Sequence, residues 1–280
     1  MSIFLQNKSR WHKTFNGFIA TVILAVSPLV INPTLAQQAA DDAPVLDKSP
    51  EAEFHMARMI YSDGNGPGRR GRFGFRRGWW AIDYPSAEFH FTRGVRRLSR
   101  IDVAEDSQHL QITDAEIFDY PWLFVQQIGQ GQWNPSNEEA ALMREYLLRG
   151  GFLVVDDFHG EYDWQVLSAA MRRIFPNKSI VDLDTDDEVF HVLYDLNKTT
   201  QIPGERHLYR AGNGEIQAQL QGPQKWAGIY DDKGRLMVAI NFNMDMGDAW
   251  EHADDAHYPE PMTALAYRFG INYVIYAMTH

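Results

Sequence analysis

Two carboxylates and an imidazole follow a run of apolar residues that is typical of a buried strand. Asp156, Asp157 and His159 come directly after residues 152–155, which are Phe-Leu-Val-Val. Ligands of open parallel sheets bind beyond the carboxyl ends of the strands, so this position favours a functional site. Neighbouring carboxylates raise one another's pKa and histidine titrates near neutral pH, which suits acid–base catalysis or metal binding. These three residues are our catalytic candidates, and the structural alternative is that an aspartate here caps the next turn.

A second group of polar residues follows the apolar run 236–242, and glutamines follow the run 122–126. Carboxylates, imidazoles and a tryptophan that we expect to be exposed resemble the composition of a sugar or metal site. The expected ligand-binding residues are Gln127, Asn243, Asp245, Asp248, Trp250, Glu251 and His252. The histidine–glutamate spacing of zinc proteases is absent, so no metal site and no cofactor is assigned. An acidic loop with a packing tryptophan is the alternative.

Three further sequence patterns resemble known binding or catalytic motifs only in part or not at all. The acidic run 182–188 has the alternate spacing of a calcium loop, but Asp187 stands where glycine is required and Leu193 where a glutamate is required, so we expect a solvated loop. The Arg/Gly-rich stretch 64–78 lacks phosphate-loop spacing; we expect a surface loop there, and its function is left open. No Gly-x-Ser-x-Gly elbow occurs, which excludes serine hydrolases of that type.

The elements that must position these residues alternate between strand-like and helix-like patterns. Ser136 and Glu139 form a capping box at the start of one helix, and Ser86 and Asp163 are expected to cap two others. The expected strands of this part are 54–61, 109–112, 122–126 and 152–155. Alternating strands and helices with short connections predict a parallel sheet that is covered on both faces.

The pattern becomes richer in strands after residue 179. Expected strands are 189–194, 207–209, 216–220, 226–230 and 236–242, and a helix at 261–278 closes the chain. Gly-Asn-Gly and Asp-Asp-Lys-Gly turns predict two hairpins among them. We therefore predict one α/β domain at 53–280, a doubly wound, mainly parallel sheet with a hairpin-rich excursion near the C-terminal half.

The first 36 residues have the three parts of a signal peptide. They contain basic residues (Lys8, Arg10, Lys13), an apolar core (15–31) and small residues before the cleavage site (Thr34, Ala36). An uncleaved anchor is the alternative, but a 17-residue run with a proline inside it is short for a bilayer span. We expect cleavage after Ala36 by the general secretory route, a disordered leader at 37–52, and a periplasmic or otherwise exported mature chain without a membrane span.

Charge and composition exclude several function classes. The chain carries a net charge of −11, and because the signal segment contributes +3, the mature chain stands at −14 and repels nucleic acid. The chain has no cysteine, which excludes a lipid-modified cysteine, a thiol nucleophile and thiolate metal ligands. Its stability must therefore come from a hydrophobic core.

Four motifs spread over residues 53–280 carry a family resemblance. They are Trp-Ala-Ile-Asp-Tyr-Pro at 80–85, Tyr-Pro-Trp-Leu-Phe at 120–124, Arg-Gly-Gly-Phe-Leu-Val-Val-Asp-Asp-Phe at 149–158 and Gly-Asp-Ala-Trp-Glu at 247–251. Together they resemble the bacterial family called domain of unknown function 4159. The resemblance implies a flavodoxin-like fold, similar to trehalose-utilisation-like and class I glutamine amidotransferase-like domains. The amidotransferases rely on a cysteine nucleophile, so their activity does not transfer to a chain without cysteine.

Two functions follow from these observations. The first is a non-catalytic binding or envelope-associated interaction module, with a carbohydrate or cell-envelope ligand and, by association of the family with envelope proteins, envelope protein partners. The second is a hydrolase or isomerase that acts on a carbohydrate through an Asp/His site, with or without a metal. The first is preferred because no complete catalytic set can be named, and enzymatic activity is left open. Placement of Asp157, His159 and either Asp245 or Glu251 within hydrogen-bond reach around one pocket would favour the enzyme.

Overall fold

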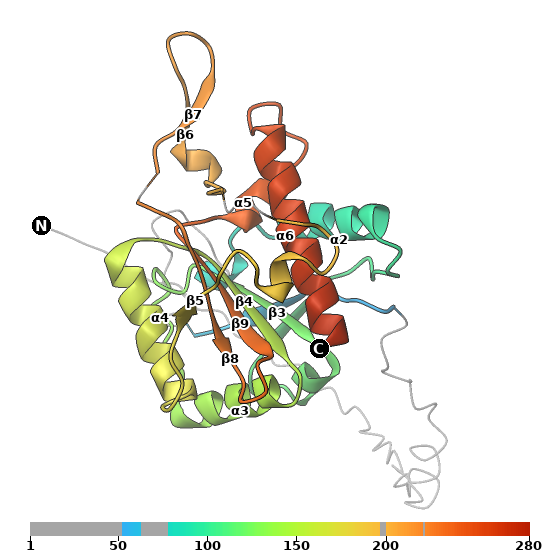
Figure 1. Ribbon diagram of the computed structural model, residues 1–280, viewed down its shortest axis with the longest axis vertical. Coiled ribbons are helices and arrows are strands. Elements are labelled where there is room, and N and C mark those ends of the chain that lie inside the picture. Colours follow the sequence, from blue (N-terminus) through green and yellow to red (C-terminus); the bar gives the residue numbers. More distant parts are fainter. Residues whose placement is uncertain (1–51, 63–77, 197–199, 221) are drawn as a thin grey trace, which may run out of the picture. The chain divides into compact units, whose positions relative to one another are not determined.

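The computed structural model describes residues 52–62, 78–196, 200–220 and 222–280 (Figure 1). The chain divides into two compact units, Met1–Lys48 and Ser49–His280, and every described residue belongs to the second. The expected signal peptide, nearly all of the expected leader and the Arg/Gly-rich stretch up to residue 77 lie outside the described residues. Within the described ranges, no helix combines the length and the apolar character that a bilayer span needs.

Seven strands form one sheet in the order β2-β1-β3-β4-β9-β8-β5. They are β1 (Ala57–Ile60), β2 (Gln108–Gln111), β3 (Trp122–Gln126), β4 (Phe152–Phe158), β5 (Val181–Asp182), β8 (Lys225–Tyr230) and β9 (Leu236–Phe242). The first five strands of this order pair in parallel, whereas β8 pairs antiparallel with both β9 and β5. The fold is therefore mixed α/β with a mainly parallel sheet, and its antiparallel pairings gather at one edge.

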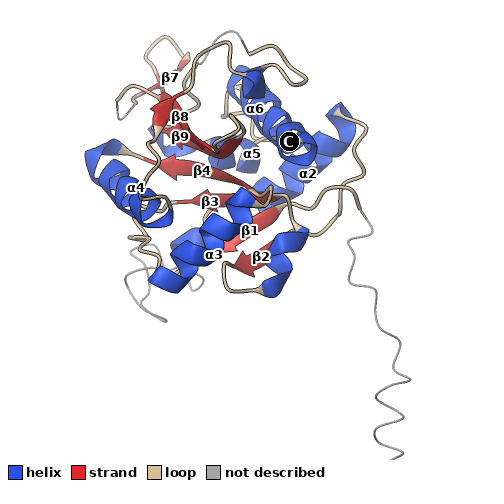
Figure 2. Ribbon diagram, turned by 60° about the horizontal axis from the view of Figure 1, so that its bottom comes forward, coloured by secondary structure: helices blue, strands red, loops and turns tan. Residues whose placement is uncertain are grey.

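Helices cover both faces of this sheet (Figure 2). The described α-helices are α2 (Ser86–Leu98), α3 (Asn137–Leu148), α4 (Gly160–Ile174), α5 (Met246–Glu251) and α6 (Glu260–Thr279). Alternate residues of β3 point to opposite faces, as the pleat requires. Trp122 and Phe124 pack into the core formed with α2, α5 and α6, and Leu123 and Val125 pack into the core formed with α3 and α4.

The helix starts agree with the sequence in one case and differ in two. Ser136 and Glu139 form the expected capping box of α3. Pro85, and not Ser86, is the N-cap of α2, and it makes no side-chain cap hydrogen bond. Helix α4 begins before Asp163, with His159 as N-cap, and the Asp163 carboxylate accepts the backbone N–H of His159 over 2.9 Å. Asp163 thus acts from inside the first turn, as the acidic member of a capping box does.

The region after residue 179 contains the two expected hairpins. Strands β6 (Leu208–Arg210) and β7 (Ile216–Ala218) form a separate antiparallel pair, and β8 pairs with β9.

The strand that was expected at 189–194 is wrong. The segment begins with the 3-10 helix η3 (Glu188–Phe190), because the Asp187 side chain accepts the backbone N–H of Val189 and turns the chain. The other 3-10 helices are η1 (Trp79–Ala81), η2 (Ala115–Asp119) and η4 (Glu205–His207).

Candidate functional site

Polar residues from several segments meet at the carboxyl edge of the parallel strands. Gln127 directly follows β3, Asp157 lies near the end of β4, and Asn243 directly follows β9; their φ angles are 53°, 49° and 57°. Asp83, between η1 and α2, has a φ of 61°. Non-glycine residues rarely adopt this left-handed region, and residues that do are frequent at functional sites. The shared backbone conformation therefore makes this edge of the sheet a candidate functional site.

Asp157 and His159 form a hydrogen-bonded pair at the end of β4. His159 Nε2 lies 3.0 Å from Asp157 Oδ1, and Gln127 Nε2 donates to Asp157 Oδ2 over 2.6 Å. Nη2 of Arg206, from η4, lies 3.7 Å from Asp157 Oδ1. Burial alone would raise the pKa of Asp157, but the hydrogen bond and charge of His159, together with Arg206 and Gln127, hold this pKa below its usual value. Asp157 is therefore an ionised carboxylate that orients the His159 ring.

Asp245 and Asp248 hold two further carboxyl groups beside this pair. Asp245 is the N-cap of α5: its Oδ1 accepts the backbone N–H of Asp248 over 3.0 Å. Asp248 Oδ2 accepts the backbone N–H of Glu205 over 2.8 Å. Burial, followed by repulsion from Asp157, raises the pKa of Asp245 well above its usual value and that of Asp248 to about 6. These groups retain protons at a pH at which Asp157 has lost its own.

A buried network positions Asp83 on the other side of the cluster. Arg58, fully buried in β1, pairs with Glu88 and donates from Nη1 to Gln126 Oε1 over 2.6 Å. Gln126 Nε2 in turn donates to Asp83 Oδ2 over 2.6 Å. Burial, followed by the charges of Asp248 and Asp157, raises the pKa of Asp83 well above its usual value. Sequence reasoning missed Arg58, Asp83 and Arg206 as site residues; the one signal was Asp83 inside a family motif.

Asp156 has a different role from its neighbour Asp157. Its Oδ2 accepts the backbone N–H groups of Met246 (2.7 Å) and Gly247 (3.1 Å) at the start of α5. Asn241 Nδ2 donates to Oδ1 over 3.3 Å. Burial, followed by the charge of Asp157, raises the pKa of Asp156 to about 7. Its carboxyl group is thus taken up in holding the start of α5, which is a structural role at a distant segment and not a cap of the turn that follows β4.

Trp250 and Asn243 are engaged within the fold. Trp250 is fully buried and stacks on Phe91 with ring centroids 4.1 Å apart, so the expectation of an exposed tryptophan is wrong. The cause is its position in α5, where it faces the sheet and not the solvent. Asn243 Oδ1 accepts the backbone N–H of Gly160 over 3.0 Å, and its Nδ2 donates to the Pro223 carbonyl over 2.8 Å. Asn243 therefore ties the end of β9 to the start of α4.

Three overlapping groups of side chains in the described part of the chain could hold a metal ion. They are Asp157 with His159 and Asp245, Asp83 with Asp245 and Asp248, and Asp248 with Glu251 and His252. Within each group, the ligand atoms lie within 4.8 Å of one another. The expected residues Asp157, His159, Asp245, Asp248, Glu251 and His252 are therefore brought together. Asp157 and His159 lie within hydrogen-bond reach of each other, and Asp245 lies within 4.8 Å of both.

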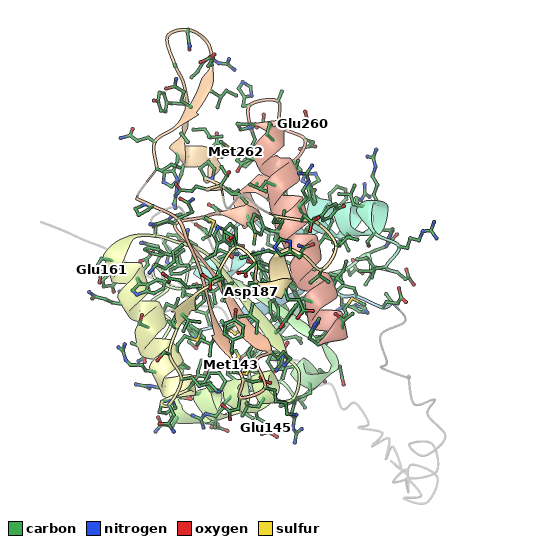
Figure 3. All side chains as sticks on the ribbon, in the orientation of Figure 1. Met143, Glu145, Glu161, Asp187, Glu260 and Met262 are labelled. Atoms are coloured by element: carbon green, nitrogen blue, oxygen red, sulfur yellow. The ribbon has the colours of Figure 1, made fainter. Side chains whose placement is uncertain are left out.

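The acidic run 182–188 lies outside this cluster. Asp187, labelled in Figure 3, caps η3 and accepts a hydrogen bond from the Tyr230 hydroxyl. Lys225 Nζ lies 3.3 Å from Asp182 Oδ1. Asp187 and Asp182 are thus used in capping and in pairing with β8.

Comparison with known proteins assigns the chain to a family. No curated protein matches the chain. A family model described as "Domain of unknown function (DUF4159)" matches residues 57–278. This match covers most of the sequence and all the strands of the seven-stranded sheet. The chain therefore belongs to the DUF4159 family.

Proposed function

We propose that this chain is an exported acid–base enzyme that hydrolyses or isomerises a carbohydrate at the carboxyl edge of its sheet. The observation that carries the proposal is the convergence of Asp157, His159 and Asp245, whose polar atoms lie within 4.8 Å of one another. Asp157 and His159 come from the end of β4 and Asp245 follows β9. A histidine oriented by a carboxylate and a second carboxyl group that keeps its proton form a complementary base and acid.

His159 is the base in this proposal. Its Nε2 is occupied by Asp157, and no described residue forms a hydrogen bond with its Nδ1. In hydrolysis, Nδ1 takes a proton from water as the water oxygen bonds to the substrate carbon. Asp245 gives its proton to the leaving oxygen as the carbon–oxygen bond breaks. In isomerisation, the same base takes a proton from the carbon beside a carbonyl group, and Asp245 protonates the carbonyl oxygen to give an enediol. His159 then returns the proton to the former carbonyl carbon, and Asp245 takes the proton of the neighbouring hydroxyl as that oxygen becomes the new carbonyl.

Gln127 and Arg206 support the base by keeping Asp157 ionised and fixed. Gln127 donates to one carboxylate oxygen, and Arg206 lies near the oxygen that His159 contacts. The Arg206 side chain is 52 % exposed, so it also stands where a ligand hydroxyl or carboxylate would meet it. Arg206 is thus a positioning residue whose charge also favours an oxygen-rich substrate.

The order of the five parallel strands, β2-β1-β3-β4-β9, supports the finer assignment to a flavodoxin-like fold. In that fold, ligands bind at the carboxyl ends of the strands beside the point where the strand order reverses, here between β1 and β3. We extend the proposal to a trehalose-utilisation-like domain, in keeping with the sequence resemblance. Export to the periplasm is proposed from the signal-peptide pattern, and N-terminal sequencing of secreted protein should then begin at Gln37.

The test is turnover by the purified mature chain. Nitrophenyl glycosides and trehalose are the hydrolysis probes, and incorporation of solvent deuterium into aldoses reports isomerisation. We expect His159→Ala and Asp157→Asn to lower turnover by about 10²–10⁴-fold. His191→Ala is the matched control, because His191 also contacts an aspartate but lies outside the cluster. Unchanged turnover in folded His159→Ala protein, checked by circular dichroism, would refute the role of the pair.

One observation favours a second candidate, the non-catalytic binding module with a carbohydrate, cell-envelope or envelope-protein partner. Asp157 and Asp245 are only 1 % and 2 % exposed, so they offer little surface to a substrate and suit groups that stabilise a binding loop. Calorimetric titration with trehalose and peptidoglycan fragments separates the two functions. Binding without turnover of any probe would replace the enzyme with the binding module.

A further inference from the structure

We infer that Asp248, Glu251 and His252 form a binding site for a divalent transition-metal cation such as Zn²⁺ on the solvent side of α5. His252 Nε2 lies 3.8 Å from Asp248 Oδ1 and 3.8 Å from Glu251 Oε2. The residues stand at positions i, i+3 and i+4, which share one face of a helical turn. One imidazole nitrogen and two carboxylate oxygens are thus presented to a single point.

Two of the three ligands also have a polar group beside their remaining side-chain atom. His252 Nδ1 lies 3.7 Å from Asp255 Oδ2, and Asp255 Oδ1 accepts the backbone N–H of His257 over 2.8 Å. The Asp255 carboxylate thus lies on the side of the ring opposite Nε2, at ion-pair distance and without a hydrogen bond to Nδ1. Asp248 Oδ2 accepts the Glu205 N–H, which leaves Oδ1 toward His252. The arrangement therefore has three ligand atoms within 4.8 Å of one another, with the Glu205 N–H fixing the carboxylate of Asp248 and Asp255 beside the His252 ring.

The ligand chemistry selects the class of cation. Mg²⁺ and Ca²⁺ prefer oxygen ligands alone, whereas imidazole with carboxylates suits Zn²⁺ and neighbouring transition metals. Two carboxylates balance a charge of +2. The side chains of Asp248, Glu251 and His252 are 15 %, 32 % and 28 % exposed, so coordination positions stay open to water or a ligand. Open positions are typical of catalytic metal sites and not of closed structural ones.

The site uses neither Asp157 nor His159, although Asp248 also belongs to the group that contains Asp83 and Asp245. The competing explanation is that the His252 ring pairs with the carboxylates of Asp248, Glu251 and Asp255 and binds no metal. Pairing of this kind requires no affinity for a metal, so a binding measurement distinguishes it from a metal site.

The test is titration of the purified mature chain with Zn²⁺ at pH 7.5 in competition with a chromogenic chelator, and with Co²⁺ for its visible absorption spectrum. We expect one Zn²⁺ whose affinity falls about 100-fold or more in His252→Ala and about 10-fold in Asp255→Asn, with loss of the Co²⁺ bands in the first variant. His191→Ala, which removes another surface histidine paired with an aspartate, should bind as the parent does.

Two results would overturn the inference. One is a His252→Ala variant that binds Zn²⁺ as tightly as the parent chain. The other is loss of Zn²⁺ binding in His159→Ala with binding retained in His252→Ala, which would place the cation among Asp157, His159 and Asp245. Because His159→Ala is expected to keep this Zn²⁺ site and lose turnover, failure of this inference and failure of the proposed enzyme give different results.

Discussion

Replacing Asp156 by asparagine should remove a large pH dependence from the stability of the fold. Asp156 is fully buried, and burial with the nearby charge of Asp157 raises its pKa from 3.8 to about 7. A rise of roughly 3 pKa units corresponds to about 4 kcal/mol. Between pH 4 and 7 the unfolded chain has lost this proton while the folded chain keeps it, so the group lowers the free energy of unfolding as the pH rises. The full penalty is present above pH 7.

The Asp156→Asn variant cannot ionise at this position and should lack this part of the pH dependence. Its amide oxygen can still accept the N–H groups of Met246 and Gly247, but its NH2 group would face the donor of Asn241. That conflict should cost about 1–3 kcal/mol at pH 4.5. At pH 8 the variant avoids the ionisation penalty, so its stability relative to the parent should rise by up to about 4 kcal/mol across this range.

The assay is urea unfolding followed by tryptophan fluorescence at fixed ionic strength from pH 4.5 to 8. The quantity to compare is the difference in the free energy of unfolding between variant and parent at each pH, because the other buried carboxylates contribute to both curves. Asp186→Asn, at an exposed position, is the control and should give a difference that changes little with pH. A difference for Asp156→Asn that stays constant across the range would refute the reasoning.

Three other substitutions test the packing and the caps. Gly204→Ala places a Cβ 2.5 Å from Asp245 Oδ2 and 2.9 Å from Asp248 Oδ2. It should therefore lower the free energy of unfolding by about 1–3 kcal/mol in urea titrations. An unchanged urea midpoint would contradict this close approach. Trp250→Ala should cost about 3–5 kcal/mol by the same assay, because it leaves a cavity beneath α5; a cost below 1 kcal/mol would contradict full burial. Ser136→Ala should lower the melting temperature by an amount equivalent to about 1 kcal/mol, and Ser136→Gly by less.

The sequence predicts those parts of the fold in which local pattern and tertiary packing agree. The strand at Trp122–Gln126 has the predicted bounds, because all five residues are buried between two layers of helices and no polar residue interrupts the run. The capping box at Ser136 and the hairpin of β8 and β9 are likewise local features. The segment 189–194 was predicted wrongly because Val189 and Phe190 are apolar and buried, as strand residues are, yet a side-chain cap at Asp187 turns the backbone.

The site was predictable only where its residues follow strands. The rule that ligands bind at strand exits was enough to group Asp157, His159 and Asp245, because the sheet is parallel at β4 and β9. Arg206 and Asp83 come from segments between the main elements, and their arrival at this edge depends on tertiary folding that no local pattern encodes. Trp250 illustrates the opposite error, since the size and polarity of an aromatic residue do not reveal which side of a short helix it occupies.

Asp156 and Asp157 show why residue type alone cannot assign a role at this edge. They are consecutive, identical and buried, yet the pKa of Asp156 is raised to about 7 while that of Asp157 is lowered. The pleat of β4 sends their side chains to opposite faces, and the left-handed backbone at Asp157, where the register with β9 shifts, separates them further. Asp156 therefore meets the amides of α5, and Asp157 meets an imidazole and a guanidinium. The chemistry of the pair is set by what the following segments bring to each face, so a role assigned to one aspartate does not transfer to the other.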